Sequence, residues 1–98
     1  MTMQTCLIEK STYFSVFQHA DKRSFVVDFG YRSITLTFCE LLYLRKQIGK
    51  LSKHSALVEM IERGSVEIIS LCNNEHFFIL SPLEIIDLRE LIEQLFTS

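Results

Sequence analysis

Three cysteines and three histidines are the side chains of this chain that could bind a metal ion. Cys72 and His76 are separated by three residues, whereas structural zinc sites use four convergent ligands, usually in close pairs. These two side chains also fall on opposite faces of the hairpin predicted below. The supporting ligands would have to come from distant positions, namely Cys6, His19, Cys39 and His54. We therefore expect no metal site.

Nucleophilic catalysis has one candidate thiol, Cys39, in the first turn of a predicted helix, a position that activates catalytic cysteines. No G-x-S-x-G nucleophile motif accompanies it. Its counterpart in the internal repeat described below is Leu83, which favours a packing role. The cysteines are widely separated and form no CxxC pair, so we expect free, buried thiols in a reducing compartment.

The sequence also contains no motif for a phosphate-binding loop or for a catalytic acid–base pair. The three glycines (Gly30, Gly49 and Gly64) are not clustered, so neither a P-loop nor a dinucleotide fingerprint exists. The carboxylates of the last predicted helix are typical of a solvated face: Glu84, Asp87, Glu90 and Glu93. The sequence thus predicts no catalytic residue and no cofactor, and we expect a protein that is not an enzyme.

Charge is distributed unevenly, although the formal net charge is only −2. Residues 22–53 carry a net charge of +5 and residues 54–98 a net charge of −6. Phosphate contacts through the basic segment 22–53 would give weak nucleic-acid binding, our alternative function. The competing interpretation is that the basic first helix faces the acidic last one, each exposed ion pair adding less than ~1 kcal/mol. The candidate partner or phosphate contacts are Lys22, Arg23, Arg32, Arg45, Lys46, Lys50 and Lys53.

Length and composition indicate a single domain over residues 1–98. Hydrophobic residues make up 48% of the chain and charged residues 22%, as in globular proteins. A domain of this size buries roughly two-thirds of its unfolded surface and needs no metal or disulfide. No apolar run reaches the ~20 residues of a membrane span. We see no signal peptide and expect a cytoplasmic protein without membrane contact.

Aromatic and β-branched residues predict strands over 12–18, 24–29 and 33–36, after a lead-in of about ten residues without a clear period. Two more strands, 65–72 and 75–80, flank the turn Asn73-Asn74 and predict a hairpin. The pattern of segment 52–64 is compatible with either a helix or a strand. Its good helix formers favour a short helix that ends at Gly64.

Two long helices are predicted from a pattern of capping and apolar residues that occurs twice in the chain, 44 residues apart. Each begins with a capping box, Thr37 with Glu40 and Ser81 with Glu84. Their apolar stripes correspond position for position: Leu41, Leu44, Ile48 and Leu51 with Ile85, Leu88, Ile92 and Leu95. The match indicates an internally duplicated β-β-α unit (12–51 and 56–96), and chance likeness of two amphipathic helices stays equally open. We expect an α+β fold, with an antiparallel sheet of five to six strands and both helices on one face.

The second hairpin is apolar on both faces. If Cys72 pairs with Glu75, one face carries Val66, Ile68, Phe77 and Ile79, and the other carries Ile69, Leu71, Phe78 and Leu80. The helices cover one face only, and soluble monomers avoid exposing large apolar patches. The second face needs the N-terminal segment, segment 52–64 or another copy of the chain. We predict a homodimer through the sheet, with coverage by segment 52–64 as the open alternative.

These observations favour a function in self-association and in interaction with an unknown protein partner. Nucleic acid is the alternative partner. Nothing in the sequence identifies a biological role.

Overall fold

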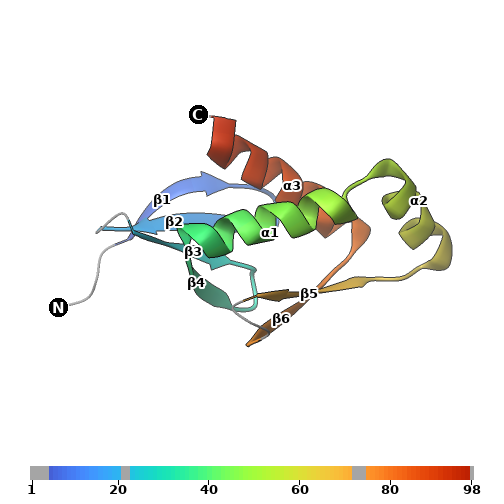
Figure 1. Cartoon of the computed structure of the whole chain (residues 1–98), viewed down its shortest axis with the longest axis horizontal. Coiled ribbons are helices and arrows are strands. Elements are labelled where there is room, and N and C mark those ends of the chain that lie inside the picture. Colours follow the sequence, from blue (N-terminus) through green and yellow to red (C-terminus); the bar gives the residue numbers. More distant parts are fainter. Residues whose placement is uncertain (1–4, 21–22, 72–74, 98) are drawn as a thin grey trace.

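The computed structural model describes residues 5–20, 23–71 and 75–97. The elements follow in the order β1 (Thr5–Lys10), β2 (Ser15–His19), β3 (Ser24–Asp28), β4 (Ser33–Thr37), α1 (Phe38–Leu51), α2 (His54–Arg63), β5 (Glu67–Leu71), β6 (His76–Leu80) and α3 (Pro82–Thr97). The fold is α+β, as predicted. Helices α1 and α3 run side by side over the strands, and α2 lies beyond their end, away from β1–β4 (Figure 1).

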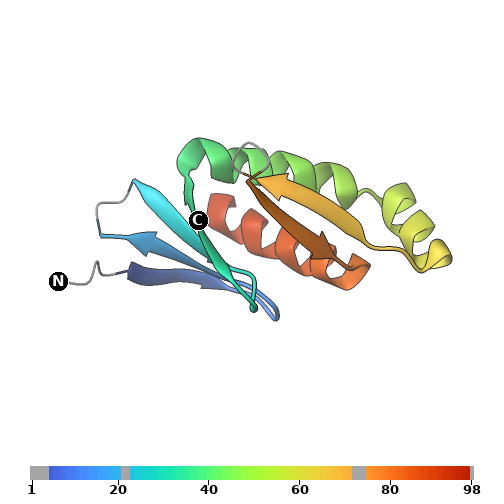
Figure 2. The same ribbon diagram turned by 90° about the horizontal axis from the view of Figure 1, so that it is seen from below.

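The strands do not form the single sheet of five to six strands that the sequence suggested. Strands β1 to β4 pair in order as an antiparallel sheet, and β5 pairs with β6 in a separate hairpin. Figure 2 shows this hairpin set apart from the four strands. A side chain bridges the two sheets: Arg32 Nη2 donates to the main-chain oxygen of Phe77 across 3.0 Å.

Strand β1 lies within the lead-in, where the sequence showed no clear period and predicted either an ordered segment or a frayed terminus. It pairs with β2, and the connecting turn is closed by a hydrogen bond from Ser11 N to the Phe14 oxygen (2.9 Å). Because residues 11–14 form this turn, β2 begins at Ser15 instead of residue 12. Asp87 of α3 holds the turn from outside by accepting bonds from Ser11 Oγ (2.6 Å), Thr12 N (3.2 Å) and Tyr13 N (3.0 Å). Asp87 is therefore half-buried and anchored, and its assignment to a solvated face was wrong.

Both predicted capping boxes are present. Thr37 and Glu40 exchange bonds of 2.9 and 3.2 Å at the start of α1, and Ser81 and Glu84 exchange bonds of 2.9 and 3.3 Å at the start of α3. The paired stripe positions of the two helices have matching environments: the first three of each stripe are buried and the last is half-buried. The duplication itself stays a prediction. Segment 54–63 is the helix α2 that we favoured, and Gly64 ends it with φ 63°.

One hydrophobic cluster joins both sheets to the helices. The ring of Phe78 in β6 is fully buried and stacks on Phe29, which directly follows β3, with ring centres 3.8 Å apart. The cysteines do not contribute as expected, because Cys6 and Cys39 are exposed. Cys39 lies one turn before the exposed Leu42 and off the buried stripe of α1. Cys72 and the predicted Asn73-Asn74 turn lie outside the described residues.

Candidate functional site

The outer face of the β5–β6 hairpin is apolar and open. The register Leu71↔His76, Ile69↔Phe78 and Ile68↔Ile79 is the one predicted from pairing Cys72 with Glu75. The inner residues Ile69, Leu71, Phe78 and Leu80 are buried, as this pairing requires. The outer residues have exposed fractions between 53% and 63%: Val66, Ile68, Phe77 and Ile79. Segment 52–64 therefore does not cover this face, and that alternative was wrong.

The geometry of this outer face suits contact with another apolar surface. Ile68 and Ile79 are directly opposite each other at its centre, and Phe77 is opposite Ser70. Within strands β5 and β6 no charged side chain shares this face, because Glu67 and His76 alternate to the other side. The exposed Glu75, directly before β6, falls on the side of Phe77 and borders the face at the turn end. Four large apolar side chains, each more than half exposed, make the kind of patch that marks an interaction surface on a soluble protein.

The basic residues of segment 22–53 come from several elements, and the structure brings Arg45 and Lys53 together at the wall of the hollow described below. Arg32 is engaged between the sheets, where its guanidinium carbon lies 4.2 Å from the centre of the Phe78 ring. Arg45 lies over the ring of Phe96, at 4.7 Å. Lys46 and Lys50 project from α1, and Lys53 precedes α2. Arg23 is exposed at the start of β3, and Lys22 lies outside the described residues.

The sequence predicted attraction between a basic α1 and an acidic α3. The ion pairs Arg63–Glu59 and Arg89–Glu93 do not link these two helices. Each of these pairs lies within one helix. The two long helices contact each other mainly through the hydrophobic core. Attraction between the basic α1 and the acidic α3 stays a prediction, and direct salt bridges at an exposed surface would add little.

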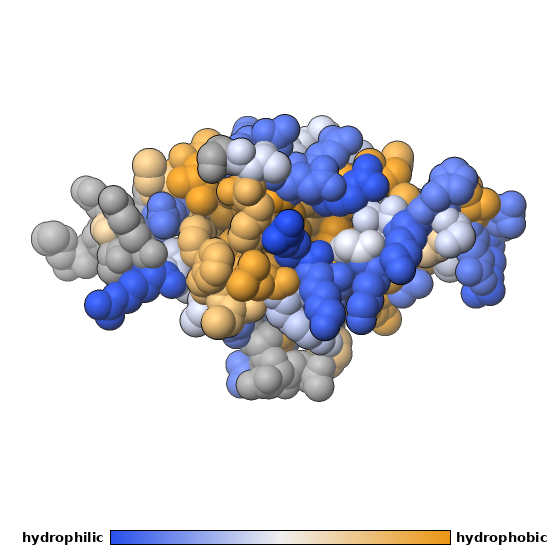
Figure 3. All heavy atoms as spheres, turned by 45° about the horizontal axis from the view of Figure 1, so that its top comes forward, coloured by the Kyte–Doolittle hydropathy of each residue, from blue (hydrophilic) through white to orange (hydrophobic). Residues whose placement is uncertain are grey.

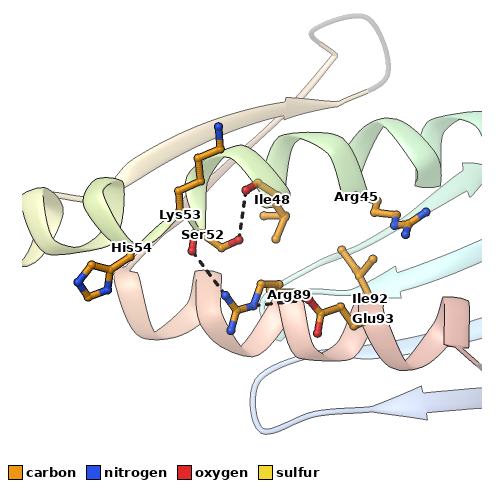
Figure 4. A pocket seen from close by; sticks show the side chains of 9 residues that line it. Arg45, Ile48, Ser52, Lys53, His54, Arg89, Ile92 and Glu93 are labelled. Carbon is orange, nitrogen blue, oxygen red and sulfur yellow. Dashed lines mark hydrogen bonds and ion pairs between the residues drawn. The ribbon is translucent and has the colours of Figure 1, made fainter.

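A hollow of about 500 Å³ lies where the end of α1, the start of α2 and the middle of α3 meet (Figure 4). Its walls include Ile48 and Gly49 from α1, Lys53 before α2, and Arg89 and Ile92 from α3. Figure 3 shows hydrophobic side chains over the half of this helical face where α1 begins and α3 ends, and hydrophilic ones toward α2. The hollow belongs to the hydrophilic half.

Arg89 is the best-fixed cation of this hollow. Its Nη1 lies 3.5 Å from the main-chain oxygen of Ser52, and its Nε lies 3.8 Å from Glu93 Oε1. The Nε–H is buried and makes no hydrogen bond. Figure 4 shows Arg89 between Ser52 and Glu93, while Arg45 and Lys53 turn outward from the hollow. No local pattern predicts this role of Arg89, because Ser52 lies 37 residues away in the chain.

Metal chemistry finds no support in the described residues, where no three His, Cys, Asp or Glu side chains come together to hold an ion. No described helix is long and apolar enough to span a bilayer. Sequence reasoning selected Arg45 and Lys53 but did not predict the hollow that they line with Arg89, since the spacing of its lining residues along the chain carries no motif. No protein-family model matches this chain, and comparisons with curated proteins and with solved structures found no significant match.

Proposed function

We propose that this protein acts by association and not by catalysis, through the outer face of the β5–β6 hairpin, and that the partner is a second copy of the chain. The observation that carries the proposal is the 53–63% exposure of Val66, Ile68, Phe77 and Ile79 on one flat face. Sheets pack face to face by interdigitating such residues. Burial of this surface would supply the hydrophobic stabilisation that the monomer forgoes.

A second copy suits this face better than a charged partner does. The centre of the face, around Ile68 and Ile79, carries no charge, so its best complement is another apolar sheet face, and the hairpin of a second chain is one. Specific dimers bury about 800 Å² on each partner, more than four half-exposed side chains provide. The neighbouring chain segments must therefore form a rim around them. The small net charge of −2 opposes self-association only weakly.

The test compares two isoleucines of equal exposure. Ile68 on the hairpin is 63% exposed and Ile61 on α2 is 62% exposed, so lysine at either position removes little buried surface from the monomer. We expect the unmodified protein to be a dimer at micromolar concentration by size-exclusion chromatography with light scattering. Ile68→Lys should give a monomer, because a buried, unpaired charge opposes the interface. Ile61→Lys should remain a dimer.

Two results would overturn the proposal. The first is a monomeric unmodified protein at about 100 μM, well above the Kd of a specific homodimer of standard size. The second is a dimer that both lysine variants weaken equally. Circular dichroism of both variants checks that neither loss reflects unfolding.

A further inference from the structure

Gly49 leaves α1 without a side chain at the wall of the hollow between α1, α2 and α3. A Cβ placed on Gly49 would meet no atom within 4 Å, so packing does not require glycine there. Glycine inside a helix costs roughly 1 kcal/mol relative to alanine. The chain therefore carries an unfavourable helix residue at a position that borders the hollow.

The lining of this space is strongly biased toward positive charge. Arg45, Lys53 and Arg89 contribute three cations from different parts of the chain, against the carboxylate of Glu93. Arg89 is held in place by Ser52 and Glu93, yet its buried Nε–H still lacks a hydrogen bond. Arg45 and Lys53 are exposed and long enough to change rotamer toward a bound anion. The net charge of the lining favours an anion.

The start of α2 lies at the same hollow, through Lys53 and His54. Lys53 is the N-cap residue and makes no side-chain cap hydrogen bond, and the first turn of α2 has no acidic residue. The first N–H groups of a helix are available to an anion when no side chain caps them. His54, the first residue of α2, also lines the hollow.

We propose that this hollow binds the phosphate group of a small organic phosphate monoester. Guanidinium groups recognise phosphate oxygens through paired hydrogen bonds, and the second negative charge of a monoester matches the excess of cations. Small-molecule sites have volumes of about 300–1,000 Å³, and the hollow of about 500 Å³ also accommodates the organic part of the ester. The side chains of Ile48 and Ile92 form the apolar wall that would contact this part. This site does not depend on the hairpin face.

The test is a titration of the ¹⁵N-labelled full chain followed by NMR at constant ionic strength, with ribose 5-phosphate and inorganic phosphate as separate probes. We expect saturable shifts of the amides at the start of α2 and of the Arg89 Nε–H. Ribose 5-phosphate should bind more tightly if the organic part occupies the hollow. Equal affinity for the two probes would contradict the ester and identify a site for inorganic phosphate.

Two variants separate a built site from general charge attraction. Lys53→Gln should weaken binding about tenfold, whereas Lys50→Gln makes the same change of charge outside the hollow and should leave the Kd unchanged. Gly49→Leu should abolish binding by filling the space. The proposal is overturned if neither probe gives saturable shifts up to about 10 mM, or if Lys50→Gln weakens binding as much as Lys53→Gln does.

Discussion

Arg32 and Phe77 connect the two sheets of this protein: Arg32 Nη2 donates to the main-chain oxygen of Phe77 at 3.0 Å. The carbon of the same guanidinium lies over the Phe78 ring of the hairpin, 4.2 Å from the ring centre. The hairpin that carries the open apolar face is thus linked to the four-stranded sheet by a side chain, where a continuous sheet would use main-chain bonds. Its inner residues pack in the common core, and Gln47 Nε2 of α1 donates to the Ser70 oxygen at 3.1 Å.

Removal of this link should loosen the hairpin. Arg32→Met keeps much of the aliphatic contact but removes the donor and the charge over the ring. We expect a loss of about 1 kcal/mol in the free energy of unfolding, measured with urea, because a hydrogen bond from a charged group and a cation–π contact are both lost. The control is Lys46→Met, which removes an exposed cation from α1.

Hydrogen exchange locates the effect of Arg32→Met. Amides of β5 and β6 should exchange faster than in the unmodified protein, while those of β1 to β4 stay protected. Equal destabilisation by Lys46→Met, or uniform acceleration across both sheets, would show that Arg32 does not specifically secure the hairpin.

Asp87 should matter more for stability than its place on an acidic helix suggests. Asp87→Ala removes the acceptor of three hydrogen bonds from the β1–β2 turn, at 2.6, 3.0 and 3.2 Å. We expect the free energy of unfolding to fall by about 2 kcal/mol, since two main-chain donors and a hydroxyl lose a charged acceptor. Glu90→Ala removes an exposed carboxylate from the same helix and should change it by less than about 0.5 kcal/mol. Similar losses in the two variants would refute the anchoring role.

The capping boxes and Asp87 show what the sequence could and could not reveal. A capping box depends on residues three positions apart, so Thr37 with Glu40 and Ser81 with Glu84 were predictable from local pattern. Asp87 instead bonds to residues 74–76 positions away, and only the packing of α3 against the first turn creates that contact. The contact of Arg89 with the main-chain oxygen of Ser52 is also long-range in sequence, so no local pattern predicts it.

The sheet illustrates the same limit on a larger scale. The register of the β5–β6 hairpin followed from a short turn, and with it the prediction that Ile68 and Ile79 share a face. Whether β4 and β6 pair is a question of tertiary structure, and the strand pattern alone does not answer it. The strand β1 was missed because Thr5–Lys10 lacks a clear period and depends on its pairing with β2.

Gly49→Ala should stabilise the protein. The new methyl group meets no atom within 4 Å, and alanine is favoured over glycine inside a helix by roughly 1 kcal/mol. For a domain of this size that gain corresponds to a rise in Tm of about 4–8 °C. Gly64→Ala is the contrasting variant: its φ of 63° is left-handed, so alanine there should lower Tm. A fall in Tm for Gly49→Ala would mean that α1 requires glycine for a structural reason.

Self-association through the hairpin face predicts that thermal stability depends on protein concentration. A partner that binds only the folded chain stabilises it by mass action, so Tm should rise as the protein is concentrated from about 1 to 100 μM. Ile61→Lys should retain this dependence, and Ile68→Lys should lose it while matching the Tm of the dilute unmodified protein. The last comparison separates a lost interface from a damaged fold, since a damaged fold would lower Tm at every concentration. A Tm of the unmodified protein that stays constant over this range would contradict the dimer, because burial of Ile68 and Phe77 against a second copy must add to the stability of the folded chain.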